Sequence, residues 1–206
     1  MDKVKFESDF NVNGIFYESC GHKMRRLLEI KRVGMHCSKP DVIFVMMNPG
    51  SSVPMIENVV DEMVSAKPDK TQFQVMKVMN ACLFDFARVI NLSDLRTPDS
   101  KVLYSFLKSK QSSRVDHSIF SVQRMEELAS VLENAPLVVF AWGLDRALTE
   151  LAEDAIASLG GEQIVGLQKE GSDTGFRHPL PRTIAAQEQW VSGIVEQIKS
   201  GQRLRF

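Results

Sequence analysis

Two short motifs, far apart in the sequence, hold the side chains best suited to chemistry. The first is the turn Asn48-Pro49-Gly50-Ser51, and the second is His178, which opens the segment His-Pro-Leu-Pro. The amide of Asn48 can orient a water molecule or read the edge of a base, and the three residues after it can contact the same ligand. His178 can carry a proton or donate a hydrogen bond to a leaving oxyanion. Each motif also fits a structural role, because Asn-Pro-Gly builds tight turns and loop histidines commonly serve packing alone.

Three arginines are the candidates for recognition of an anion. Arg96 follows an apolar run, Arg177 directly precedes His178, and Arg182 follows the His-Pro-Leu-Pro segment. A guanidinium group is planar and charged, so it suits phosphate or carboxylate ligands. The alternative for each arginine is a solvated position on the surface.

The elements that must position these residues are four buried strands. Apolar runs at 42–47, 88–92, 137–141 and 163–167 alternate with segments of helical periodicity. This alternation predicts a three-layer α/β/α fold, in which the four strands are adjacent in a mostly parallel sheet with helices on both faces. The carboxyl ends of parallel strands share one edge of a sheet, so we expect the Asn48 turn and the His178 loop to lie near each other.

Apolar spacing and capping residues predict six helices between and after these strands. Their expected ranges are 56–63, 72–83, 99–108, 122–133, 145–159 and 185–199. Before the first buried strand, Asn13-Gly14 predicts the turn of an antiparallel hairpin, and the alternation at 26–32 predicts an edge strand beside the central one. We therefore expect a single α/β domain over 1–206, with the hairpin and edge strand in 1–36 and a tail at 200–206.

Composition limits the classes of protein to which the chain can belong. Its 206 residues are 44% apolar, and 25 Lys and Arg against 26 Asp and Glu give a net charge of −1. Strong non-specific DNA binding needs a basic field, so it is not expected. The start of the chain has no apolar signal segment and no run approaches the length of a membrane span, so we expect a cytoplasmic protein with no membrane association. Nothing in the sequence indicates its oligomeric state.

No cofactor or metal site is expected. The three cysteines contain no CxxC pair, which is typical of a reducing compartment. Cys20, His22, His36 and Cys37 have spacings that fit no tetrahedral zinc site.

The order of the motifs resembles two known families. Asn48-Pro49-Gly50, the segment ending at Trp142-Gly143, and His178-Pro-Leu-Pro resemble the Asn-Pro-Gly and His-Pro-x-Pro motifs of the uracil-DNA glycosylase superfamily. Met47-Asn-Pro, Asn91-Leu92 with Arg96, Ala141-Trp-Gly and Gly175-Phe-Arg-His-Pro-Leu are similar to a bacterial family of unassigned function, the domain of unknown function 1643. The second resemblance covers roughly residues 25–182.

The glycosylase resemblance implies roles for individual residues. Asn48 would position the hydrolytic water near the anomeric carbon, and His178 would stabilise the charge on the departing base. Phe73, Trp142 or Phe176 would offer a face on which an extruded base stacks, although packing in the core or a loop is the alternative for each ring. Gly143, beside Trp142, would contact the same ligand. We expect Asn48, Trp142 and His178 to line one pocket.

Two departures from the glycosylase pattern argue against duplex DNA as the substrate. Met46 stands where those enzymes usually have a glycine, and Leu180 stands where they have a serine that contacts DNA phosphate. The expected function is hydrolysis of an N-glycosidic bond in a nucleotide, a nucleoside or a single-stranded nucleic acid. The alternative is a non-catalytic module that binds a nucleotide-like ligand or a partner on the same fold.

Overall fold

The four predicted buried strands lie side by side in the computed structural model, which describes residues 8–56, 61–133, 135–204 and 206. They are β6 (Phe86–Asn91), β3 (Val42–Met46), β7 (Val138–Ala141) and β8 (Ile164–Gly166), in that spatial order. The three pairings between these neighbours are parallel. The prediction of four adjacent parallel strands is therefore confirmed.

The prediction of a mostly parallel sheet is wrong, because four further strands join the same sheet with antiparallel pairings. These are β1 (Phe10–Ser19), β2 (His22–Arg32), β4 (Val53–Pro54) and β5 (Met63–Lys67), and the full order is β4-β5-β1-β2-β6-β3-β7-β8. The pairs β4–β5, β5–β1, β1–β2 and β2–β6 are all antiparallel. A two-residue connection such as the one between β1 and β2 permits only this arrangement, since parallel neighbours need a long crossover.

The N-terminal hairpin exists, but its turn lies elsewhere than predicted. Asn13 and Gly14 are inside β1 and pair with Glu29 and Leu28 of β2. The turn is at Cys20-Gly21, whose φ angles of 49° and 77° suit a tight two-residue hairpin. The predicted edge strand is also wrong, because β2 lies between β1 and β6, while β4 and β8 form the edges of the described sheet.

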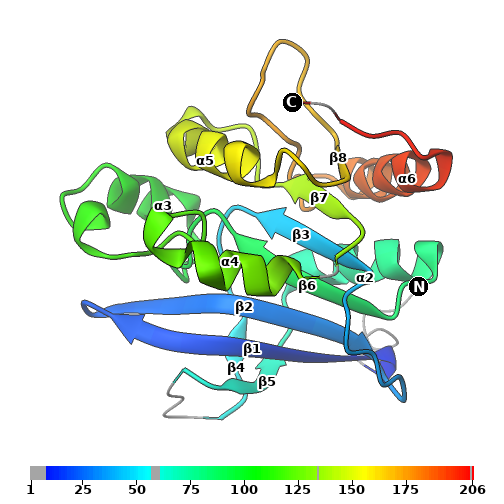
Figure 1. Cartoon of the computed structure of the whole chain (residues 1–206), viewed down its shortest axis with the longest axis horizontal. Helices are drawn as coiled ribbons and strands as arrows, with labels where there is room; N and C mark the ends of the chain where they lie inside the picture. Colours follow the sequence, from blue (N-terminus) through cyan, green and yellow to red (C-terminus); the bar gives the residue numbers. More distant parts are fainter. Residues whose placement is uncertain (1–7, 57–60, 134, 205) are drawn as a thin grey trace.

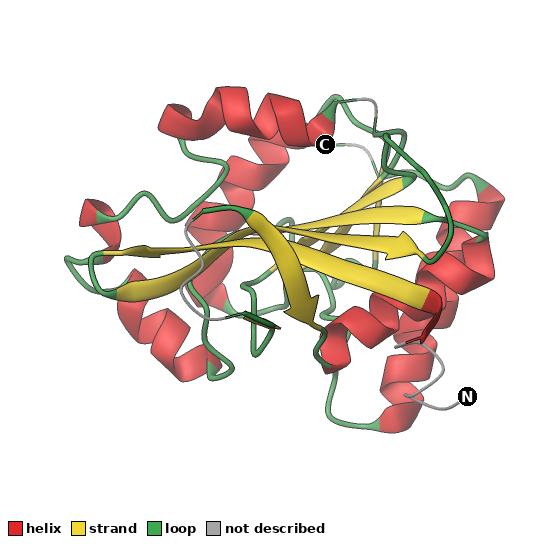
Figure 2. Cartoon of the chain, turned by 90° about the horizontal axis from the view of Figure 1, so that it is seen from below, coloured by secondary structure: helices red, strands yellow, loops and turns green. Residues whose placement is uncertain are grey.

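Helices cover both faces of the sheet, so the three-layer prediction is confirmed (Figure 1). α2 (Lys70–Cys82) and α6 (Ile184–Ser200) pack on one face, and α3 (Ser100–Leu107), α4 (Met125–Leu132) and α5 (Thr149–Leu159) pack on the other. Figure 2 shows helices on either side of the twisted sheet. Five of the six predicted helices correspond to these elements. None of the helices in the described ranges is long and apolar enough to cross a membrane.

The helix predicted at 56–63 is not present in the part that can be compared. Residues 57–60 lie outside the described residues, Ile56 is in a bend, and Met63 begins β5 by pairing with Ile15. Ile56 and Met63 are 57% and 42% exposed, so their apolar spacing does not correspond to a buried helix face.

The central strand β3 has a separate hydrophobic cluster on each side. Val42, Phe44 and Met46 pack with α2 and α6, whereas Ile43 and Val45 pack with α3, α4 and α5. Burial on both faces explains why the run is apolar without alternation. It also fixes the position of the strand end, where the Asn48 turn begins.

Candidate functional site

A cavity of about 530 Å³ opens at the carboxyl end of β3, a volume typical of small-ligand sites. Its walls come from chain segments that are distant in the sequence. They are residues 46–51, residues 67–73 at the start of α2, Thr97 and Pro98 after β6, His178 and Leu180, with Arg25 and Val53. The structure thus brings together Asn48, Pro49, Gly50, Ser51 and His178 of the predicted site.

Asn48 is held in a single orientation by the loop after β6. Its Nδ2 donates hydrogen bonds to the backbone oxygens of Leu95 at 3.0 Å and Thr97 at 2.8 Å. Both amide protons are then used, so the remaining hydrogen-bonding capacity of this side chain is the acceptor Oδ1. Asn48 can accept a hydrogen bond from a water molecule or ligand, but it has no proton left to donate to one.

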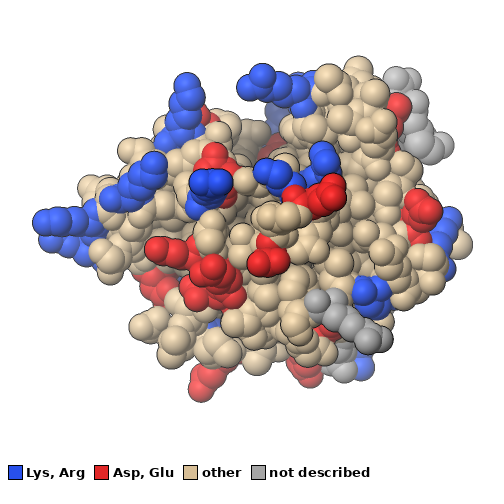
Figure 3. Space-filling model, turned by 90° about the horizontal axis from the view of Figure 1, so that it is seen from above, with Lys and Arg blue, Asp and Glu red and all other residues tan. Residues whose placement is uncertain are grey.

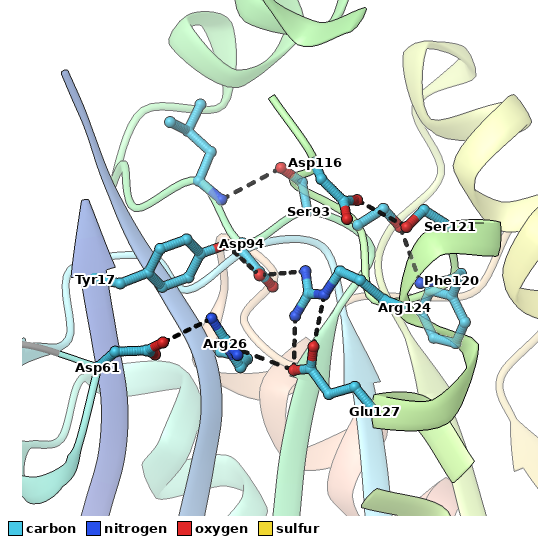
Figure 4. A network of polar contacts seen from close by, with 12 residues as sticks. Tyr17, Arg26, Asp61, Ser93, Asp94, Asp116, Phe120, Ser121, Arg124 and Glu127 are labelled. Carbon is cyan, nitrogen blue, oxygen red and sulfur yellow. Dashed lines mark hydrogen bonds and ion pairs between the residues drawn. The ribbon is translucent and has the colours of Figure 1, made fainter. Parts of the chain in front are cut away.

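A buried polar network fixes the loop that holds Asn48 (Figure 4). Oδ2 of Asp94 accepts hydrogen bonds from the Tyr17 hydroxyl at 2.7 Å and from the Arg124 guanidinium at 2.6 Å. Arg124 also forms a bidentate pair with Glu127. Burial raises the pKa of Asp94 to about 7, although the charge of Arg124 opposes this shift. The network therefore anchors the residue just before Leu95, one of the two acceptors of Asn48.

His178 presents a defined tautomer at the cavity. Its Nδ1 accepts a hydrogen bond from the backbone N–H of Leu180 at 3.1 Å, so the proton of the neutral ring is on Nε2. Burial lowers the pKa of His178 to about 4, while the charge of Asp69 opposes this shift. The ring is therefore a neutral hydrogen-bond donor at pH 7, which suits stabilisation of a developing negative charge.

Trp142, Gly143 and Phe176 hold the His178 loop and do not line the cavity. Trp142 and Phe176 are both fully buried and their rings make an edge-on contact. The indole N–H of Trp142 donates to the oxygen of Thr174, and Gly143 and Phe176 exchange two backbone hydrogen bonds. The structure thus places the two aromatic rings in the core, and Trp142 does not line the cavity with Asn48 and His178 as predicted.

The start of α2 closes one side of the cavity through a contact with Gly50. Asp69 caps the helix, since its Oδ1 accepts from the backbone N–H groups of Thr71 and Gln72. A Cβ atom on Gly50 would lie 2.8 Å from Oδ2 of Asp69, and Gly50 has a φ of +64°. Glycine is required here both for the turn and for the approach of the Asp69 carboxylate.

Arg25 is a cavity residue that the sequence analysis missed, and a β-bulge places it there. Ile15 pairs with Leu27, but the next residue of β1, Phe16, pairs with Arg25, so Arg26 is an extra residue in β2. Bulges re-aim the side chains that follow them. Regular alternation would put Arg25 on the face of Leu27, whereas the bulge puts it on the face of Phe16, where α2 and the cavity lie.

The guanidinium of Arg25 is buried with few partners. The residue is 1% exposed, its Nη1 donates to the oxygen of Pro49 at 3.4 Å, and its Nε has no hydrogen-bond partner among the described residues. Burial lowers the pKa of Arg25 to about 10, opposed by the charge of Asp69, so the group is still a cation at pH 7. Arg25 does not stand out in the sequence, because β2 also contains Lys23, Arg26 and other charged residues, and the face that Arg25 occupies depends on the bulge.

The predicted arginines, Arg96, Arg177 and Arg182, are not part of the cavity wall. Arg96 lies over the ring of Phe16 at 5.0 Å, and its charge is close enough to lower the pKa of Arg25. Arg177 is exposed, and its backbone oxygen accepts a hydrogen bond from Trp190. Arg96 therefore lies near Arg25 but outside the cavity wall. Arg177 helps to hold the His178 loop through its backbone oxygen.

No three His, Cys, Asp or Glu side chains gather as a metal site would require, within the ranges that the structure describes. The cavity wall instead offers a neutral imidazole, an amide acceptor, a carboxylate and cationic side chains.

Comparison with known proteins places the chain in a family. A model of a family described as protein of unknown function, DUF1643, matches residues 29–180. The chain belongs to the DUF1643 family. The resemblance to this family is thereby confirmed, whereas no curated protein and no solved structure matched the chain. The DUF1643 match includes Asn48 and His178 and begins after Arg25.

Proposed function

We propose that the cavity binds a nucleotide-like ligand and hydrolyses its N-glycosidic bond. The observation that supports this function is the presence in one cavity wall of Asn48, whose unused group is the acceptor Oδ1, and of His178, whose neutral ring has its proton on Nε2. A glycosidic bond between them needs an acceptor on the side of the attacking water and a donor on the side of the departing base.

The proposed reaction uses the side chains of the wall as follows. Asn48 Oδ1 accepts a hydrogen bond from a water molecule and orients it toward the anomeric carbon. As the carbon–nitrogen bond breaks, its electron pair moves into the base, and His178 Nε2–H donates a hydrogen bond to the base oxygen that gains charge. The Asp69 carboxylate, whose Oδ1 is used by the helix cap, can take the proton of the water through Oδ2 and return it to the released base.

Size and charge favour a small or single-stranded substrate over duplex DNA. Met46 and Leu180 both lie in the cavity wall and occupy space beside Asn48 and His178. Acidic and basic side chains are interspersed on the face shown in Figure 3, with no continuous basic field there. A duplex binder would need such a field to neutralise many phosphates.

One observation favours the alternative function, a binding module without catalysis. The two hydrogen bonds from Asn48 to Leu95 and Thr97 join the turn after β3 to the loop after β6. Asn48 thus has a structural role in the described chain. Its Oδ1 can accept a hydrogen bond from a bound ligand without any reaction taking place.

Release of free base decides between these functions. We expect the wild-type protein to release base from at least one of a panel of uracil-, hypoxanthine- and xanthine-containing nucleotides, nucleosides and single-stranded oligonucleotides, followed by chromatography. Asn48→Ala and His178→Ala should each lower the rate about 10²-fold or more, because each removes a transition-state interaction.

Matched controls test whether these losses are specific to the cavity. Asn11 and His36 are exposed and lie outside the cavity wall, so Asn11→Ala and His36→Ala should retain the wild-type rate. If the wild-type protein releases no base at high concentration from any member of the panel, the hydrolase proposal is wrong and the binding module takes its place.

A further inference from the structure

We propose that Arg25 forms an anion subsite in this cavity and that the ligand it binds carries a phosphate monoester. Naming that ligand as a nucleoside monophosphate rests on the proposed function. The structural basis is a guanidinium that is 1% exposed, lines the cavity, and has one long hydrogen bond, to the oxygen of Pro49 at 3.4 Å.

The hydrogen-bonding capacity of Arg25 is not satisfied by the described residues. A guanidinium has five N–H donors, and Nε of Arg25 is buried without any partner. A buried charge is costly unless it is paired and hydrogen-bonded, so a group in this state is expected to receive an anion from outside the chain.

A second unpaired polar group lies on the same face of the sheet. Asn91 is fully buried, and both its Nδ2 and its Oδ1 have no partner among the described residues. Asn91 follows Val89 of β6 by two positions, and Val89 packs in the cluster on the face of α2. Asn91 does not line the cavity, but its unpaired amide shows that polar groups on this face of the sheet are left for a buried water molecule to satisfy.

The cavity wall is cationic although the whole chain has a net charge of −1. Arg25, Lys67 and Lys70 contribute three positive groups to the wall, against the single carboxylate of Asp69. Oδ1 of that carboxylate already accepts two backbone N–H groups at the start of α2, which offsets part of its charge. An anion that enters the cavity thus meets an excess of positive charge.

A phosphate monoester matches this wall better than a singly charged carboxylate. It has close to two negative charges and three acceptor oxygens, so it can bind the planar donors of Arg25 and still accept from the two lysines. In a nucleotide, the phosphate at Arg25 would leave the sugar and base to extend toward Asn48 and His178.

Calorimetry on the full chain at low salt tests the subsite without any measurement of catalysis. The probes are inorganic phosphate, acetate at matched ionic strength, uridine, and uridine 5′-monophosphate. We expect the monophosphate to bind at least about tenfold more tightly than uridine, and phosphate to bind where acetate does not. Arg25→Met should remove the advantage of the monophosphate, while Arg26→Met, a change at the extra residue of the bulge, should keep it.

A second pair of variants keeps the test decisive if Arg25→Met fails to fold, which circular dichroism would show. Lys67 and Lys70 are exposed at the wall, so the double change Lys67→Met with Lys70→Met should weaken monophosphate binding about tenfold. Lys77→Met, in α2 but outside the wall, should not. Equal binding of uridine and its monophosphate, equal binding of acetate and phosphate, or binding that is insensitive to these variants would overturn the inference.

The two proposals can fail separately. Phosphate-dependent binding without base release would leave the Arg25 subsite in place and remove the hydrolase. Base release with no preference for a phosphate would leave the hydrolase in place and remove the Arg25 subsite.

Discussion

The amide of Asn48 joins two loops through its N–H groups, and its oxygen is the group that we propose orients the attacking water. These two tasks can be separated by substitution. Asp at this position keeps an acceptor oxygen but loses the donors that Leu95 and Thr97 accept from.

We therefore predict that Asn48→Asp lowers the free energy of unfolding by about 1–3 kcal/mol, since two carbonyl oxygens lose their donor and face a carboxylate instead. Urea denaturation measures the change. A variant as stable as the wild-type protein would show that the loop after β6 does not depend on Asn48.

Burial of His178 leads to a prediction about pH. Its pKa in the folded protein is lowered to about 4 from an ordinary value of 6.5, so between these values the unfolded chain binds more protons than the folded one. Stability contributed by the neutral ring should be fully present above pH 6.5 and be lost as the pH falls toward 4. Titration of the imidazole by NMR, with His178→Ala to assign the resonance, should give a midpoint near 4. A midpoint at 6.5 or above would contradict the buried neutral tautomer.

At the residue scale, sequence reasoning identified the groups with unusual chemistry but not all of their surroundings. Asn48 and His178 stand out because each follows a buried strand in a motif of turn-forming residues. Arg25 does not, because its place in the cavity depends on a bulge that regular alternation cannot reveal. Trp142 and Phe176 were predicted to contact the ligand, with core packing as the alternative, and the structure places both in the core and outside the cavity wall.

At the scale of elements, the contact between the Asn48 turn and the start of α2 depends on one glycine. Gly50 and Gly171 both have positive φ, but only a Cβ on Gly50 would contact Asp69, while one on Gly171 would meet nothing within 4 Å. Substitution of Gly171 therefore measures the cost of the left-handed backbone alone, whereas substitution of Gly50 adds the cost of displacing the Asp69 carboxylate.

We predict that Gly50→Ala and Gly171→Ala each lower the free energy of unfolding by about 1–2 kcal/mol for the left-handed backbone. Gly50→Ala should cost more than Gly171→Ala and also weaken ligand binding, because Asp69 must move. Denaturation and calorimetry on the two variants measure both effects. Equal losses of stability, with binding unchanged, would refute the role assigned to this contact.

The parallel half of the sheet could be predicted from sequence, and the antiparallel half could be predicted only in part. Strands buried on both faces, such as β3, are apolar throughout and are bounded by turn residues. The turn predicted at Asn13-Gly14 is wrong, because the alternation of buried and exposed residues continues through these two positions in β1. Cys20-Gly21 makes the turn instead, and a non-glycine residue at positive φ is not evident from composition.

At the scale of the whole molecule, charge restricts the ligand more than shape does. The chain has a net charge of −1, and the excess of positive charge is local to the cavity wall. Such a distribution favours a small anion over a long polyanion.

We predict that duplex DNA binds more weakly than a nucleoside monophosphate at physiological salt. Any binding of single-stranded oligonucleotides should weaken as salt rises, since it depends on contacts between cationic side chains and the phosphate groups. Fluorescence anisotropy across a salt series measures both. Tight binding of duplex DNA that persists at high salt would contradict this account of the surface.

A crystal structure of the protein with a nucleoside monophosphate would show whether one ligand contacts Arg25, Asn48 and His178 together. We predict a phosphate within hydrogen-bonding distance of the Arg25 guanidinium, a sugar beside Asn48 Oδ1, and a base oxygen that accepts from His178 Nε2. A nucleotide bound outside the cavity, or inside it without contact to His178, would contradict the account.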